Sequence, residues 1–259
     1  MHIRLIHPQD FSATASVAVS SFWGEETLSW VHRYKAEYPE DFRQFFLRKL
    51  KLRYWAIGCY IHVAVLNKGD KNYLYEGQVV GYAVWERQGE SDMARKWRQP
   101  SLRRRKASCT YKATVRQITS PINLLAAVLE IALLQLEENY YALTCADKSI
   151  DYDRLRQYVK IEQFDNILEI WRLRGLCVDP AFQGRGIAGK LLDWGQEQAS
   201  REACPIGLMS SQMAEAVYFK KGFREYCRVL IGGLIDVPAM IWEPKGLEGK
   251  WGIEGTTET

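Results

Sequence analysis

The sequence predicts an α/β protein, and three observations support this. The 259 residues are 47% hydrophobic and 25% charged, as in ordinary globular proteins, and the length suits one large domain or two small ones. Short segments rich in Val, Ile and aromatic residues, typical of strands, are interspersed with segments whose apolar residues follow helical spacing. One such strand passes directly into a helix through a turn that contains Gly184, Gly186 and Gly189.

The N-terminal third is predicted to run strand, helix, helix, strand, strand. Residues 3–7 alternate as a strand does, and Asp10 is a candidate cap for the helix that follows. Pro39 suits the first turn of a second helix. Residues 59–66 and 78–87 are rich in valine, isoleucine and aromatic residues, and the polar stretch between them predicts a hairpin.

The remaining chain is predicted to form a basic segment, a long helix and then further strands and helices. Residues 88–118 carry many lysines and arginines without apolar periodicity, which favours a solvated loop over a binding patch. Ser120 is a candidate cap for the long helix, whose apolar run at 124–136 is too short to span a bilayer and predicts burial. The later elements are a strand at 168–178, a helix from about 187, a strand at 206–210, a helix at 214–222, and strands near 223–230 and 237–242.

Composition argues against several classes of protein. The net charge of +4 is too small to predict nucleic-acid binding. The six cysteines form no CxxC pair and follow no secretory signal, which favours free thiols and a cytoplasmic location. The four histidines show no ligand spacing, so we expect no metal site, and no segment predicts a membrane span.

The glycine turn is the most informative stretch. The first N–H groups of a helix have no partner within the helix, and glycines lack the Cβ atoms that would keep an anion away from them. The chain has no GKS or GKT after the turn and no GxGxxG, which argues against a triphosphatase loop and a Rossmann site.

The stretch from Gln183 to Ala188 reads QxxGxA, which resembles the (Q/R)xxGx(G/A) signature of the GNAT N-acetyltransferase superfamily. "LCVDP" precedes it as the family's fourth strand would, and "AEAVYFKKGF" at 214–223 resembles the family's last conserved helix. "VVGYAVWER" and "MIWEP" are similar to segments of fungal small-molecule acetyltransferases. The resemblance implies a mixed, mostly antiparallel sheet with splayed fourth and fifth strands, flanked by helices. We expect one GNAT domain over 1–259, with an insertion at 88–167 between the third and fourth strands and a cofactor-binding core at 168–223.

The resemblance also implies an acetyl-coenzyme A site. Backbone amides of residues 184–188 would hold the pyrophosphate, and the backbone of residues 176–178 would pair with the pantetheine arm. Ser211 is either a pantetheine contact or an ordinary serine at a strand end. The implied cofactor-binding residues are Leu176, Cys177, Val178, Gln183, Gly184, Arg185, Gly186, Ile187, Ala188, Ser211 and Tyr218.

Candidate catalytic residues follow from the same resemblance. Tyr218 stands where the family places its general acid, although a core tyrosine is the alternative. The base is unassigned, because the family's glutamate on the fourth strand is missing. Glu86 and Glu169 are the candidates, and either can instead be a surface carboxylate. Cys177 is a weaker candidate for a nucleophile, since no histidine is near it in sequence.

The expected function is transfer of an acetyl group from acetyl-coenzyme A to an amine of a small molecule, by direct attack in a ternary complex. The alternatives are a GNAT-fold enzyme with another acyl donor or reaction, a noncatalytic coenzyme A-binding module, and a nucleic-acid or protein binder that uses the basic segment. Aromatic residues suit a wall of the acceptor pocket. The candidates are Trp23, Trp30, Tyr34, Phe45 and Trp85.

Overall fold

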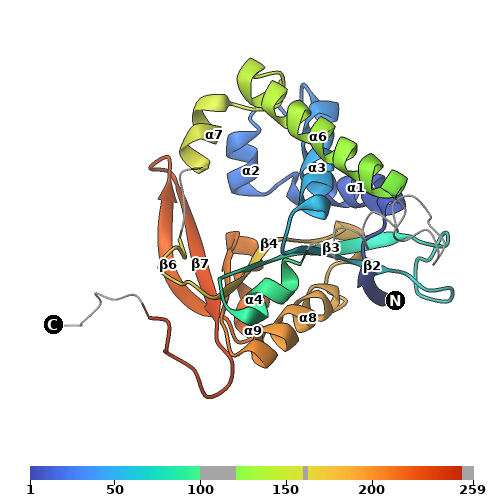
Figure 1. Cartoon of the computed structure of the whole chain (residues 1–259). Helices are drawn as coiled ribbons and strands as arrows, with labels where there is room; N and C mark the ends of the chain where they lie inside the picture. Colours follow the sequence, from blue (N-terminus) through green and yellow to red (C-terminus); the bar gives the residue numbers. More distant parts are fainter. Residues whose placement is uncertain (100–120, 160–162, 253–259) are drawn as a thin grey trace.

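A seven-stranded sheet lies at the centre of the protein (Figure 1). The computed structural model describes residues 1–99, 121–159 and 163–252. The strands are β1 His2–Leu5, β2 Cys59–Val65, β3 Val79–Gln88, β4 Ile170–Val178, β5 Ile206–Met209, β6 Arg224–Ile231 and β7 Ile235–Trp242. Their order is β1-β2-β3-β4-β5-β7-β6, and β4 and β5 run parallel whereas the other neighbours are antiparallel. The predicted mixed, mostly antiparallel sheet is confirmed.

Helices cover both faces of this sheet. The α-helices are α1 Phe11–Phe22, α2 Glu26–Val31, α3 Pro39–Trp55, α4 Asp92–Trp97, α6 Pro121–Thr144, α7 Tyr152–Tyr158, α8 Ile187–Glu202 and α9 Glu215–Lys220. Three short 3-10 helices accompany them: η1 Pro8–Asp10, η3 Pro180–Phe182 and η4 Gln212–Ala214. Figure 1 shows α1, α2, α3, α6 and α7 on one side of the sheet, and α4, α8 and α9 on the other. No helix in the described ranges is long and apolar enough to cross a bilayer.

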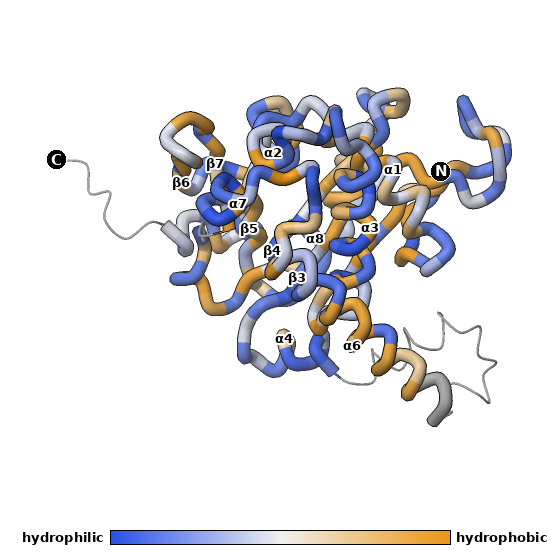
Figure 2. The backbone as a smooth tube through the Cα atoms, turned by 90° about the horizontal axis from the view of Figure 1, so that it is seen from above, coloured by the Kyte–Doolittle hydropathy of each residue, from blue (hydrophilic) through white to orange (hydrophobic). Residues whose placement is uncertain are grey.

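Three hydrophobic clusters of the described residues pack against the sheet, and the two larger ones lie on its two faces. Strand β2 is buried along its whole length and divides its side chains between them: Ile61 and Val63 pack with α1 and α3, whereas Tyr60 and Ala64 pack with α8. Figure 2 shows hydrophobic stretches around the central strands, and further ones along α6 and at the tip of the β6–β7 hairpin. This three-layer arrangement explains why the central strands are apolar on both sides.

The parallel pair β4–β5 is short and then opens. Its register runs from Trp171 opposite Ile206 to Leu173 opposite Leu208, and β4 continues to Val178 without β5. On its other edge β4 carries a bulge, because Leu173 pairs with Trp85 and Gly175 with Val84. The predicted splay of the fourth and fifth strands is therefore present.

Two details of the sequence prediction are wrong. The carboxylate of Asp10 does not cap α1; it accepts hydrogen bonds from the Arg4 guanidinium (2.6 Å) and the His7 amide (2.7 Å). The long helix α6 is not buried all round, since it lies outside α3 and only its inner face, with Ala127 and Leu134, enters the core. The outer face exposes Leu125, Leu129, Leu133, Leu136, Tyr140 and Leu143.

Three short helices, α2, α4 and α7, were not predicted. Each is only six or seven residues long, which is too short for apolar periodicity to reveal. Ser120 and the basic residues 103–106 lie outside the described residues.

Two buried histidines make the stability of the fold depend on pH. The ring of His62, on β2, packs against Trp194 with 4.1 Å between centroids and a tilt of 37°, and burial lowers the pKa of His62 from 6.5 to about 4. Burial, together with the charges of Lys35 and Arg48, lowers the pKa of His32 to about 3. The unfolded chain takes up these protons below pH 6.5 whereas the folded protein resists them, so stability is lost as the pH falls.

His62→Phe keeps an aromatic ring against Trp194 and removes one of these titrations. Between pH 6 and 4.5 we expect the free energy of unfolding of the wild type to fall more steeply than that of the variant, by about 1 kcal/mol per pH unit. Denaturant melts at several pH values measure this, and His2→Gln, at an exposed histidine, is the control. Parallel curves for wild type and His62→Phe would contradict the assignment.

Candidate active site

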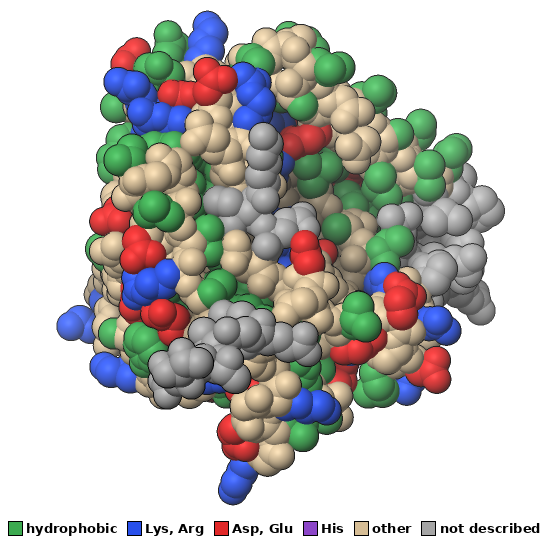
Figure 3. Space-filling view, turned by 90° about the vertical axis from the view of Figure 1, so that its left-hand side faces the viewer, with side chains coloured by type: hydrophobic (Ala, Val, Ile, Leu, Met, Phe, Trp, Pro, Cys, Tyr) green, Lys and Arg blue, Asp and Glu red, His purple; other side chains and the backbone are tan. Residues whose placement is uncertain are grey.

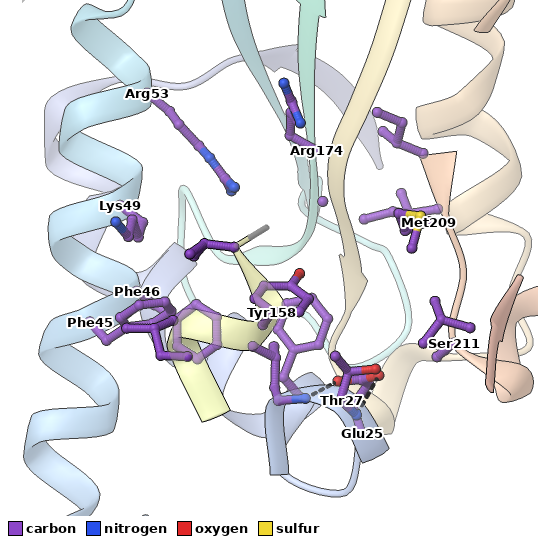
Figure 4. Close-up of a pocket in the computed structure, with 18 of the residues that line it drawn as sticks. Glu25, Thr27, Phe45, Phe46, Lys49, Arg53, Tyr158, Arg174, Met209 and Ser211 are labelled. Atoms are coloured by element: carbon purple, nitrogen blue, oxygen red, sulfur yellow. Dashed lines mark hydrogen bonds between the residues drawn. The ribbon is translucent and has the colours of Figure 1, made fainter. Parts of the chain in front are cut away.

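A cavity of about 500 Å³ lies where β4 and β5 diverge. Its walls come from α2, α3, α6 and α7 on one face of the sheet, from the η4–α9 region on the other, and from β4 and β5 between them. A hollow beside α6 is visible in the space-filling view (Figure 3), and Figure 4 shows the pocket from within. Because the sheet is interrupted here, one cavity receives side chains from both helical layers.

Aromatic rings form one wall of this cavity. Phe45 and Phe46 of α3 pack edge to face at 5.4 Å, and Phe46 stacks on Phe22 at 5.5 Å. Tyr158, the last residue of α7, points into the centre of the pocket (Figure 4). An apolar or aromatic ligand body fits such a surface.

Tyr218 reaches the cavity from the opposite layer. It belongs to α9, its ring packs on Phe223 at 5.5 Å, and only 5% of it is exposed. Nevertheless it lines the pocket. Burial, with a smaller contribution from Cys177, raises the pKa of Tyr218 well above its ordinary value, so the phenol stays protonated at neutral pH. A protonated phenol can donate a proton or a hydrogen bond.

The charged side chains of the lining are mostly paired. Arg48 and Asp147 are buried and form an ion pair at 3.0 Å. Lys49 of α3 is paired with Glu138 of α6. Arg174, the extra residue of the β4 bulge, donates from Nε to Glu86 at 2.5 Å. These ion pairs neutralise most of the charged side chains that line the cavity.

Glu25 and Arg53 are different, and no motif or spacing in the sequence singles them out. Glu25 caps α2, since its carboxylate accepts hydrogen bonds from the amides of Thr27 (3.1 Å) and Leu28 (2.6 Å), and no cation of the described residues forms an ion pair with it. Arg53 lies in the last turn of α3, and among the described residues no carboxylate lies within ion-pair distance of it. Figure 4 shows the two on opposite sides of the pocket.

The glycine loop follows β4 directly. Gly184 and Gly186 have φ of +73° and +74°, in the left-handed region that favours glycine, and a Cβ on either would project into open space. Gly186 is the N-cap of α8 and no side chain caps this helix. The side chains of Ile187 and Ala188 pack into the core below. The first amides of α8 therefore lie beside an open backbone surface that suits an anion.

Neighbouring side chains hold this loop. Arg185 donates to the carbonyl oxygens of Ala181 (2.9 Å) and Lys71 (3.3 Å), so its side chain braces the loop. Gln183 donates from Nε2 to the carbonyl oxygen of Val178 at 3.0 Å. That oxygen also accepts from the Ser21 hydroxyl at 3.0 Å, so it is already occupied.

The remaining predicted cofactor residues differ in their position. Leu176 and Ser211 line the cavity, at the end of β4 and after β5. Cys177 and Val178 are buried and are not part of the lining. Burial raises the pKa of the Cys177 thiol well above its ordinary range, which disfavours the thiolate that a nucleophile needs.

The structure brings neither predicted base to the cavity. Glu86 is outside the lining and is paired with Arg174. Glu169 precedes β4 and accepts hydrogen bonds from the Glu90 and Ser91 amides (both 2.7 Å) and from the Arg87 guanidinium (2.6 Å). Partial burial opposes ionisation, but these bonds and one from the Ser91 hydroxyl lower the pKa of Glu169 to about 2. Its role in this structure is to fix the turn between β3 and α4.

Of the aromatic residues predicted for the acceptor pocket, the cavity includes Phe45 alone. Trp85 is fully buried on the other face of the sheet, under Gly195 of α8. Trp30 packs against the β6–β7 turn at Gly232. Trp23 and Tyr34 are 42% and 38% exposed and lie outside the lining.

Residues 137–225 match the acetyltransferase (GNAT) domain family. Over this part, about a third of the chain, which includes β4, the glycine loop, α8 and α9, the sequence is similar to a GNAT acetyltransferase domain. An uncharacterized N-acetyltransferase of Schizosaccharomyces pombe is 38% identical over 79 residues, which cover 27% of this chain and 32% of that relative. The match thus spans about a third of the relative's length.

A crystal structure from Corynebacterium glutamicum, described as histone acetyltransferase HPA2 and related acetyltransferase, is similar to this chain with a TM-score of 0.54. The two are 18% identical, and the similarity covers 93% of this chain and 95% of that one. At this identity the likeness concerns the fold. It extends through nearly the whole chain, including the N-terminal strands and helices that the family match leaves out.

The contacts of Glu169 give a prediction for stability. Glu169→Ala leaves two amides and part of the buried Arg87 guanidinium without their acceptor, and we expect the free energy of unfolding to fall by about 1–3 kcal/mol. Glu197→Ala, which removes an exposed pair with Arg201, is the matched control and should change little. Chemical denaturation of both variants measures the difference. An unchanged stability for Glu169→Ala would show that the turn does not depend on this carboxylate.

Proposed function

We propose that this protein transfers an acetyl group from acetyl-coenzyme A to an amine of a small molecule. The observation that carries the proposal is the continuity between the glycine loop, the free end of β4 and the cavity at the splay. A long cofactor with an anionic centre and a reactive end can lie along this path, and the cavity has room for a second small molecule. The GNAT domain match supports the same chemistry.

The residues present fit the pyrophosphate of coenzyme A. Two left-handed glycines with open space above them and an uncapped helix start are the features that such a group requires. Residues Gly184, Gly186, Ile187 and Ala188 would hold it through their amides, with Gln183 and Arg185 bracing the loop. Leu176 and Ser211 would line the path of the arm. Acetyl-coenzyme A supplies the acetyl group as a thioester.

Tyr218 is proposed as the general acid. It is held protonated by burial and reaches the cavity at the splay, where the thioester sulfur would lie. Donation from its hydroxyl lowers the barrier to departure of the thiolate, because charge grows on that sulfur as the bond to the acetyl carbon breaks.

Glu25 replaces Glu86 and Glu169 as the proposed proton acceptor. The other carboxylates of the cavity, Glu138 and Asp147, are engaged in ion pairs, whereas Glu25 is bound only by the amides of α2. A carboxylate without a cationic partner can attract a protonated amine and receive its proton, directly or through one water.

A glutamate at position 186 tests the loop. Gly186→Glu places bulk and negative charge at the proposed pyrophosphate position, so the rise in melting temperature with acetyl-coenzyme A should disappear. In the wild type, ligand at 100 times its dissociation constant stabilises the fold by about 2.7 kcal/mol. Gly246→Glu is the control, since Gly246 has a similar φ of +84° and open space. It follows β7, whose end lies beside the starts of β5 and β4, whereas the loop follows the end of β4. An equal thermal shift in Gly186→Glu and wild type would refute the assignment.

Tyr218→Phe separates an enzyme from a noncatalytic binding module. Phenylalanine keeps the ring that packs on Phe223 and removes only the hydroxyl. We expect turnover, measured as release of free thiol, to fall at least tenfold, because general acid catalysis contributes about 10²- to 10⁴-fold. Cofactor affinity should remain within a few-fold.

The control for this substitution is Tyr226→Phe, which removes a phenol outside the cavity that is bonded to Asn166. A Tyr218→Phe variant as fast as the wild type would exclude the acid role. A wild type that binds acetyl-coenzyme A but releases no thiol with any amine would support the binding module, and release with longer acyl donors alone would support another acyl substrate.

A further inference from the structure

Arg53 and Glu25 line the cavity with opposite charges, and neither forms an ion pair with another side chain of the described residues. Among its described cations, Arg48, Lys49 and Arg174 have acidic partners, and Arg172 lies over the ring of Phe164. Arg53 has no acidic partner in the described chain. The matching group of opposite sign is Glu25.

Arg53 is placed to meet a ligand. It comes from the last turn of α3 but extends across the cavity to β4, where its Nη1 lies 3.8 Å from the position of a Cβ on Gly175. Gly175 immediately follows the bulge, at the beginning of the part of β4 that β5 leaves. The guanidinium of Arg53 therefore lies beside the proposed reaction centre. Because residue 175 is a glycine, no side chain of β4 fills the space next to this guanidinium.

Tyr158 lies between the two charges. Burial raises the pKa of Tyr158, the negative charge of Glu25 raises it further, and the positive charges of Arg53 and Arg174 oppose this. Figure 4 agrees with this order, with Arg53 and Arg174 on one side of Tyr158 and Glu25 on the other. A molecule that lies along Tyr158 and the phenylalanine wall thus meets a carboxylate at one end and a guanidinium at the other.

We propose that the acceptor is an amine that also bears a carboxylate, and that Arg53 is the residue that selects the carboxylate. This rests on the proposed function. A guanidinium presents two parallel N–H donors that match a carboxylate, and such pairs are stronger than neutral hydrogen bonds. Glu25 faces the amine, and the ring wall of Phe45 and Phe46 holds the apolar body between the two charged ends. One unpaired guanidinium suits a single negative charge better than a phosphate dianion.

The test uses pairs of acceptors that differ by one carboxylate, with the full-length chain and acetyl-coenzyme A. Phenylalanine is compared with 2-phenylethylamine, and 4-aminobutyrate with butylamine, so that the spacing between amine and acid also varies. In the wild type at least one carboxylated member should have a kcat/KM about 10- to 100-fold above its neutral partner, as expected for a charge-assisted bidentate pair.

Arg53→Met should abolish this preference while the rate with the neutral amines and the KM for acetyl-coenzyme A stay within a few-fold. Arg53→Lys should retain part of it. Lys49→Met is the matched control, because it removes one positive charge from the same helix and the same cavity but from an existing ion pair, and it should keep the preference. A readout independent of turnover is the thermal shift by 3-phenylpropionate with coenzyme A present, which should be lost in Arg53→Met and kept in Lys49→Met.

The outcomes separate the two proposals. If the wild type acetylates neutral amines as well as carboxylated ones and 3-phenylpropionate gives no shift, the acid-bearing acceptor is wrong and the acetyltransferase remains. If Arg53→Met slows both members of each pair equally, Arg53 serves the reaction or the fold rather than selection, and the proposal is overturned. If no amine releases thiol from the wild type, the proposed function fails together with it.

Discussion

The separation of β4 from β5 is the constraint on which the rest of the site depends. The two strands are parallel and share register only as far as Leu173 and Leu208. Beyond that point a continuous sheet would place a wall of backbone between the helical layers. Because β5 ends and β4 continues, a cavity forms in the plane of the sheet, and Tyr218 from one layer and Phe45, Arg53 and Tyr158 from the other line the same space.

Electrostatics in this cavity follow from burial as much as from charge. Tyr218, in the lining, is a neutral donor because it is desolvated, and Cys177, buried next to the lining residue Leu176 but outside the lining, is an unreactive thiol for the same reason. Glu169 shows the opposite case, in which several donors keep a carboxylate ionised and immobile outside the cavity. The side chains with perturbed pKa thus divide into those that line the cavity and those that hold the fold, and only contacts in three dimensions distinguish them.

Much of the fold could be predicted from the sequence because its long elements are strongly periodic. Helix α3 begins at Pro39 as predicted, and the central strands lie within one or two residues of their predicted bounds. The glycine loop was also predictable, since left-handed backbone leaves a direct mark on composition. Glu25, Arg53 and Tyr158 were not, because each comes from a different helix and nothing local indicates that they meet. The exposed face of α6 shows the converse: apolar residues reveal that a helix forms, but which of its faces is covered depends on its neighbours.

The bulge at Arg174 sets which way the end of β4 faces. Side chains of a regular strand alternate, so Leu173 and Cys177 should share a face; instead, Leu173 packs in the core beneath α8 and Cys177 in the core beneath α1 and α3. Because of this one extra residue, each side chain of β4 after the bulge points to the opposite face of the sheet from the face that regular alternation would give it. The orientation in which the chain enters the glycine loop changes with it. In evolutionary terms, the C-terminal end of β4 is therefore intolerant of insertions and deletions of one residue. A change of two residues would keep each side chain on its face of the sheet and alter only the length of the strand.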